Sequence, residues 1–188
     1  MKKLLITLVL FSLTGLYTVN AQGFKPPADG KAVVYFVRVT KYGKPTAFEF
    51  FHQDKYIGAF KGDQYMVYEC DPGTQLFWAS SENKEFLTAE LEAGKTYVVV
   101  VDVIMGAMKA RVGLTPLDLS DTETWGRVKK LINGRPPTVT PEDKIEKMNK
   151  KLEKFIAEKL EMYETTWKNE HDFHHLSADM AIPEEELK

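Results

Sequence analysis

Three histidines near the end of the chain have the residue type and spacing that favour metal binding. They lie in the run His171-Asp172-Phe173-His174-His175. On a continuing helix, His171 and His175 would share one face with His174 beside them, a spacing that can chelate a transition-metal ion. The alternative is a solvated helix end, where the helix dipole favours a cationic histidine. Because the sequence identifies no fourth ligand, we predict no metal site and keep these three histidines as the metal candidates.

The run Gly94-Lys95-Thr96 is similar to the end of a phosphate-binding loop. That motif needs a glycine five residues before Gly94, where this chain has Ala89. It also needs a helix after the loop, whereas a strand pattern follows here. We therefore expect Gly94 to form a hairpin turn, and we predict no nucleotide site.

Two further reactive side chains fit structural roles. The only cysteine, Cys70, falls in a strand pattern and has no assignable histidine, so we expect a buried thiol. Asp102 interrupts an apolar strand, and we expect it to pair with Lys109 or Arg111 on the next strand. We predict no catalytic residue and no cofactor, and interpret the protein as a non-enzyme.

Several aromatic side chains could form the floor of a carbohydrate groove, because a flat ring can pack on a sugar. Their spacing in strand patterns places most of them in the core instead. Carbohydrate binding is therefore retained only as an alternative. The residues concerned are Tyr35, Tyr42, Phe77, Trp78 and Tyr97.

These residues are carried by a succession of short β-rich runs separated by turn residues. Seven or eight such runs predict a mainly β fold, an antiparallel β-sandwich, rather than βαβ units. The run 95–104 is apolar on both faces, so we expect a central strand whose outer face is covered. Asp71-Pro72-Gly73 predicts a tight hairpin turn with Gly73 at positive φ. The expected strands are 32–38, 46–53, 55–60, 64–70, 74–81, 85–92, 95–104 and 108–116.

A short helix is predicted after the strands. Ser120-Asp121-Thr122-Glu123 has the pattern of a capping box, in which the serine and the glutamate satisfy free amide groups at a helix start. Gly134 is expected to stop the helix as a left-handed residue beyond its end. The apolar stripe of this helix consists of Trp125, Val128, Leu131 and Ile132.

A long helix is predicted over residues 141–170, with Thr140 as its N-cap and Pro141 in its first turn. Its apolar positions recur about every 3.67 residues, whereas a left-handed coiled coil needs 3.5. We therefore favour docking on the protein's own sheet over a zipper between chains, which leaves monomer and homodimer both open. The stripe includes Ile156 and Leu160, and its other members form a candidate interaction surface: Ile145, Met148, Leu152, Phe155, Tyr163 and Trp167.

The N-terminus has the pattern of a secretory signal peptide. Lys2 and Lys3 precede an apolar run over 4–13, and the small residue Ala21 lies at the expected cleavage point before Gln22. A membrane-spanning helix needs about 20 apolar residues, so we expect cleavage and no transmembrane anchor. The chain is therefore predicted to be exported, to the periplasm or the cell exterior.

Four segments together resemble the bacterial envelope family catalogued as domain of unknown function 2846, which is similar to PEGA-like and transthyretin-like sandwiches. The resemblance covers about residues 31–116. It implies a β-sandwich and an envelope setting, and it brings no catalytic residues. The segments are Lys31-Ala32-Val33-Val34-Tyr35-Phe36-Val37-Arg38, Asp54-Lys55-Tyr56-Ile57-Gly58, Tyr68-Glu69-Cys70-Asp71-Pro72-Gly73 and Leu91-Glu92-Ala93-Gly94-Lys95-Thr96-Tyr97-Val98-Val99.

With 188 residues and a net charge of −2, the chain fits one globular domain and has no basic cluster for nucleic acid. We expect a non-enzymatic envelope module that binds a partner protein or scaffolds a complex. The alternative is a carbohydrate-, small-ligand- or metal-binding sandwich. The expected division is a signal peptide over 1–21, a leader over 22–30, the sandwich over 31–118, a helical extension over 119–175 and a frayed tail over 176–188.

Overall fold

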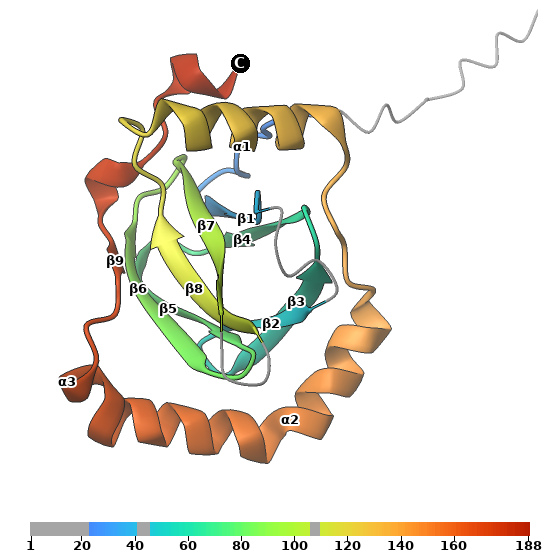
Figure 1. The fold of residues 1–188 in the computed structure, drawn as a ribbon, viewed down its shortest axis with the longest axis vertical. Helices are drawn as coiled ribbons and strands as arrows, with labels where there is room; N and C mark the ends of the chain where they lie inside the picture. Colours follow the sequence, from blue (N-terminus) through green and yellow to red (C-terminus); the bar gives the residue numbers. More distant parts are fainter. Residues whose placement is uncertain (1–22, 41–45, 106–109) are drawn as a thin grey trace, which may run out of the picture.

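In the computed structural model, which describes residues 23–40, 46–105 and 110–188, two β-sheets lie between two helical layers (Figure 1). All eight expected strands are present, with ends shifted by no more than a few residues, and the mostly β character is confirmed. In chain order the strands are β1 (Ala32–Val37), β2 (Ala47–His52), β3 (Lys55–Lys61), β4 (Tyr65–Cys70), β5 (Gly73–Ser80), β6 (Lys84–Leu91), β7 (Thr96–Met105) and β8 (Ala110–Pro116).

The strand order differs from an all-antiparallel sandwich. One sheet has the order β4-β1-β7-β8, and the other has β3-β2-β5-β6-β9, where β9 (His175–Leu176) is a short ninth strand. β1 pairs with β7 in parallel, and β6 pairs with β9 in parallel. The antiparallel prediction is therefore wrong for these two pairs.

Two turns that we expected to close hairpins instead carry the chain from one sheet to the other. Gly73 does adopt positive φ, at 99°, and Gly94 does so at 77°. However, β4 and β5 belong to different sheets, and so do β6 and β7. Tight turns bounded by strand patterns look alike in the sequence whether or not the two strands pair.

The main core lies between the sheets, where alternate residues of the facing strands meet. It includes Phe36 of β1, Phe50 of β2, Phe77 of β5 and Val99 of β7. β7 lies between β1 and β8, which confirms the central strand predicted from its apolar faces. All six residues of β1 are buried, because the outer face of its sheet is covered as well.

That cover is α1 (Thr122–Gly134), which lies across the first sheet in Figure 1. The predicted stripe is confirmed, since its four residues are buried in one cluster with residues of β1 and β7. The predicted caps are wrong in detail. Asp121 is the N-cap and accepts a hydrogen bond from Thr124 N at 3.0 Å, whereas Ser120 donates its hydroxyl to Asp118. Gly134 is the last helical residue rather than a left-handed residue beyond the helix.

The second sheet is covered by the long helical run, which consists of α2 (Glu142–Met162), the π-helical segment η1 (Tyr163–Trp167) and α3 (Lys168–Glu170). Its apolar face packs on Phe51, Trp78 and Phe86, so docking on the protein's own sheet is confirmed. Pro141 occupies the N-cap position without a side-chain capping bond, and Thr140 instead accepts a hydrogen bond from Ala59 N at 3.4 Å.

α2 also covers the free edge of β3. The side-chain amide of Asn149 accepts a hydrogen bond from Tyr56 N at 2.8 Å and donates one to Tyr56 O at 3.1 Å. A further strand would pair with β3 through these two backbone groups. An uncovered strand edge is a template for association between chains. Asn149 therefore ends the second sheet on this side.

The C-terminal residues, which we expected to fray, pack along the molecule instead. After β9 the chain returns to the first sheet, where Ile182 N donates to Thr96 O at 2.8 Å and the Ile182 side chain is 3% exposed. The Glu186 carboxylate accepts hydrogen bonds from Trp125 Nε1 at 2.8 Å and Lys129 Nζ at 2.9 Å. At the other end, Phe24 of the leader packs against Trp125. Of the helices in the described ranges, none combines the length and the apolar character that crossing a bilayer requires.

Candidate functional site

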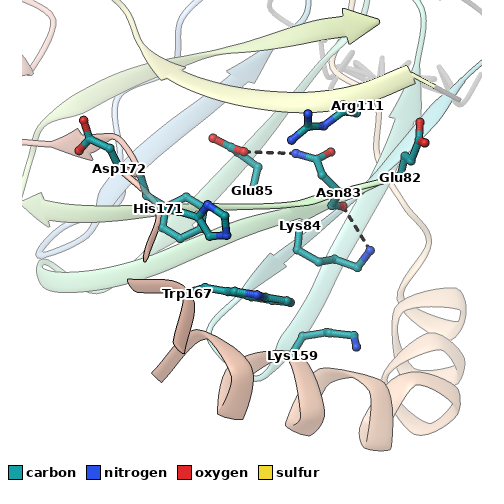
Figure 2. A pocket seen from close by; sticks show the side chains of 10 residues that line it. Glu82, Asn83, Lys84, Glu85, Arg111, Lys159, Trp167, His171 and Asp172 are labelled. Atoms are coloured by element: carbon teal, nitrogen blue, oxygen red, sulfur yellow. Dashed lines mark hydrogen bonds between the residues drawn. The ribbon is translucent and has the colours of Figure 1, made fainter. Parts of the chain in front are cut away.

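A polar pocket of about 480 Å³ opens where the end of the long helical run approaches the turn between β5 and β6 (Figure 2). Four parts of the chain line it. The β5–β6 turn and the start of β6 contribute Glu82, Asn83, Lys84 and Glu85; β8 contributes Arg111; the helical run contributes Lys159 and Trp167; and the segment after it contributes His171, Asp172 and Phe173.

Asn83 fixes the position of the pocket wall by joining the two sheets. Its side-chain amide donates to Val112 O and accepts from Val112 N, both at 2.8 Å. Ser81 Oγ donates to Ala110 O at 2.5 Å on the same strand. The β5–β6 turn of one sheet is thereby bound to β8 of the other on either side of Arg111, whose side chain lies beside the pocket in Figure 2.

Glu85 is a partly buried carboxylate in this wall. It accepts a hydrogen bond from Asn83 Nδ2 at 3.2 Å. Burial raises the pKa of Glu85 above its ordinary value, and the nearby positive charge of Arg111 opposes the shift. A carboxylate held in this way is a strong acceptor for hydroxyl donors.

Two lysine side chains, Lys84 and Lys159, line the helical side of the pocket. Lys84 Nζ donates to Ser81 O at 3.3 Å and to Asn83 O at 3.2 Å. Lys84 Nζ and Lys159 Nζ each lie 5.6 Å from the centroid of the Phe155 ring. Burial lowers the pKa of Lys84, and the positive charge of Lys159 lowers it further.

Trp167 supplies a flat apolar surface. It is the last residue of η1, and π-helical turns within α-helices often occur at functional sites. The indole packs against Phe86 at a centroid distance of 5.9 Å and is partly exposed. Figure 2 shows the ring seen edge-on between Lys84 and the helix.

The three histidines predicted as metal candidates are not brought together. The helical run ends at Glu170, and His171 adopts an extended conformation, so the helical spacing on which the hypothesis rested is absent. His171 lines the pocket, whereas His175 lies in β9 with its Nδ1 2.8 Å from Thr88 Oγ1, and His174 is exposed. The described ranges contain no group of three or more His, Cys, Asp or Glu residues able to hold a metal ion.

Four of the five aromatic residues considered for a carbohydrate groove belong to the core. Tyr35, Phe77, Trp78 and Tyr97 are each at most 1% exposed, and Tyr42 lies outside the described residues. A saccharide could therefore not stack on them. Trp167, which the sequence placed on the helical stripe, borders the polar pocket instead, together with Phe173.

The other reactive side chains lie away from the pocket or have structural partners. Cys70 is buried as predicted, and burial raises the pKa of its thiol to about 11. Asp102 accepts a hydrogen bond from Thr115 Oγ1 at 2.6 Å, while Lys109, one of its two expected partners, lies outside the described residues. His52 contacts Tyr68 Oη at 3.0 Å through Nδ1 and Gln75 Oε1 at 2.7 Å through Nε2.

The candidate interaction surface on the long helix is turned toward the sheet. Tyr163 is buried, and the other five residues are partly buried against the same aromatic cluster: Ile145, Met148, Leu152, Phe155 and Trp167. The face that we offered for a partner is thus used inside the molecule. The polar pocket went unrecognised in the sequence because its walls come from segments about 80 residues apart.

Comparison with known proteins identifies no family, since no family model matches the chain and no curated protein matches it significantly.

Proposed function

We propose that the protein is an exported, non-enzymatic binding module of the bacterial cell envelope, and that its polar pocket binds a saccharide. The observation that carries the proposal is the combination of Trp167 with Glu85 and Arg111 in one pocket. A sugar ring has apolar C–H faces and hydroxyl edges, so it needs a flat aromatic surface beside hydrogen-bonding groups. A scaffolding role through the long helix is less well supported, because that helix face packs on the sheet.

What supports a preformed binding site is that several polar side chains of the pocket wall have structural partners. Both polar atoms of the Asn83 amide bond the backbone of Val112, and Lys84 bonds two backbone carbonyls. A pocket wall fixed in this way needs little reorganisation when a ligand binds, which lowers the cost of binding.

Tryptophan fluorescence offers a direct test. Of the three tryptophans, Trp78 is 0% and Trp125 is 5% exposed, so a ligand in the pocket should alter mainly the emission of Trp167. Titration of the chain from Gln22 with oligosaccharides should give a saturable change in emission, and calorimetry should show that Trp167→Ala abolishes the binding itself. Met162→Ala, at an exposed residue of the same helical run, is the control and should retain it. No response to any saccharide contradicts the binding site, and release of new reducing ends contradicts the non-enzymatic role.

Export is proposed from the pattern of residues 1–21, which lie outside the described residues. N-terminal sequencing of the protein from the exporting cell should find Gln22 as the first residue. An intact Met1, or a lipid on the mature chain, contradicts the proposal.

We further propose that residues 31–116 form a transthyretin-like sandwich of the envelope family that the sequence resembles. Two packed sheets with a shared aromatic core are compatible with that assignment. Its support remains the order of the four turn and strand segments. A shared fold does not identify a ligand, so the saccharide proposal rests on the residues of the pocket.

A further inference from the structure

Two lysine side chains line the helical side of the polar pocket, and neither forms an ion pair shorter than 4.0 Å within the described ranges. Lys84 is partly buried, and its ammonium group bonds only backbone carbonyls within the described ranges. Lys159 has Glu158 as its salt-bridge partner at 4.0 Å, and the Glu158 side chain is 68% exposed. Burial and the positive charge of Lys159 lower the pKa of Lys84, and the negative charge of Glu49 opposes this shift only in part. An anion bound near both ammonium groups would therefore be stabilised.

The acidic residues of the pocket lie apart from the two lysine ammonium groups or are exposed to solvent. Glu85 lies beside Asn83 and under the positive charge of Arg111. Glu82 and Asp172 are exposed. The pocket is therefore divided, with a carboxylate acceptor beside Arg111 and a pair of ammonium groups beside Phe155.

A ligand that matches both halves has hydroxyl groups and a negative charge on one ring. We infer that the saccharide bound by this pocket is acidic, and that its anionic substituent binds between the ammonium groups of Lys84 and Lys159. This inference rests on the proposed function. The sugar ring packs on Trp167, and its hydroxyl groups donate to Glu85. Carboxylate and phosphate substituents share the required charge, and the test distinguishes them.

The test compares ligands that share their sugar rings and differ mainly in charge. Trigalacturonate and its methyl ester have the same rings, but esterification removes the negative charges. Galactotriose is the neutral reference for trigalacturonate. Galactose 6-phosphate tests for a phosphate substituent, and galactose is its neutral reference. Affinities are measured by Trp167 fluorescence and by calorimetry at two salt concentrations.

We expect at least one acidic sugar to bind about tenfold or more tightly than its neutral counterpart, because a charge-assisted hydrogen bond is stronger than a neutral one. Lys159→Gln should weaken binding of the acidic sugar more than binding of the neutral sugar, and should so remove that preference. This variant is preferred to one at Lys84, which supports the turn through its backbone bonds. Lys151→Gln, at an exposed position of α2, is the control and should retain the preference.

The outcomes distinguish saccharide binding from the preference for an acidic saccharide. If neutral sugars bind as tightly as acidic ones, or if Lys159→Gln keeps the preference, the inference is overturned while saccharide binding stands. If no sugar binds, both are overturned. Preference for trigalacturonate identifies a carboxylate, and preference for the phosphorylated sugar alone identifies a phosphate.

Discussion

Glycine conformation illustrates how single residues shape this fold. Gly73 adopts a φ of 99°, a region that residues with a Cβ atom rarely enter. Gly126 lies on the exposed side of α1 and has ordinary helical φ. An added Cβ would meet nothing within 4 Å at either position, so the two sites differ in backbone conformation rather than in contacts.

Replacement of each glycine by alanine should therefore have opposite effects. Gly73→Ala should lower the free energy of unfolding by about 1 kcal/mol or more, because alanine resists positive φ. Gly126→Ala should raise it by about 0.5–1 kcal/mol, because alanine loses less entropy in a helix. Chemical denaturation of both variants measures the two values. If both variants changed the free energy of unfolding in the same direction, Gly73 would not require its left-handed conformation.

Glu85 predicts a pH dependence that can be assigned to one residue. Burial raises the pKa of Glu85 in the folded protein, so the folded state holds the proton to higher pH than the unfolded chain. Between the two pKa values the folded state binds more protons, and stability therefore falls as pH rises through that interval. The contribution of the protonated form is complete below about pH 4 and is lost above the folded pKa.

Glu85→Gln should abolish this loss, so the variant should gain stability relative to wild type as the pH rises from 4 to neutrality. Denaturation at a series of pH values measures the difference. Glu153→Gln, at an exposed position of α2, controls for the removal of one negative charge. A difference that stays constant across the range would contradict the assignment to Glu85.

At the scale of elements, the long helical run has two tasks. Its first part covers the aromatic outer face of the second sheet and the edge of β3. Its last part brings Trp167 to the pocket through η1. One element thus connects the packing of the sheet with the geometry of the site.

Ile156 is the buried residue of α2, at 3% exposed, and it tests the docking. Ile156→Asp should reduce the free energy of unfolding by about 3 kcal/mol or more, because a charge then lies unpaired in an apolar interface. Lys154→Asp, on the exposed side, should have little effect. Melting temperatures across a wide dilution series check the result. A wild-type melt that depends on concentration, with a variant that is monomeric and folded, would indicate pairing between chains.

At the scale of the whole molecule, the C-terminal segment ties the layers together. It adds β9 to the second sheet, returns to β7 through Ile182 and reaches α1 through Glu186. In Figure 1 this segment runs along one side of both sheets, from α3 to α1. The two sheets and both helical covers are therefore linked by residues that follow the last long helix.

Removal of residues 178–188 should destabilise the protein by about 2–4 kcal/mol, because it deletes the buried Ile182 and exposes its site. Calorimetry should show a lower melting temperature for the truncated chain. Glu186→Gln retains an acceptor for Trp125 and should change the melting temperature little. An unchanged melting temperature after truncation would mean that the segment is not docked in solution.

Much of the local structure follows from the sequence alone. The strands and helices were predictable because side chains alternate with period 2 in a strand and about 3.6 in a helix. The same periodicity indicated the central position of β7 and the docking of α2. The positive φ of Gly73 was predictable from the residues of its turn.

Only the tertiary structure decided which strands pair, where the helical run ends and how the pocket is assembled. The turns at Gly73 and Gly94 have local signals that do not distinguish a hairpin from a crossing between sheets. The extended conformation of His171 accompanies the pairing of β9 with β6, a contact with a strand more than 80 residues away. The pocket likewise joins Glu85, Arg111 and Trp167, three residues that are far apart in the sequence. Local periodicity carries no information about such contacts, because they depend on how whole faces pack rather than on the residues beside them in the chain.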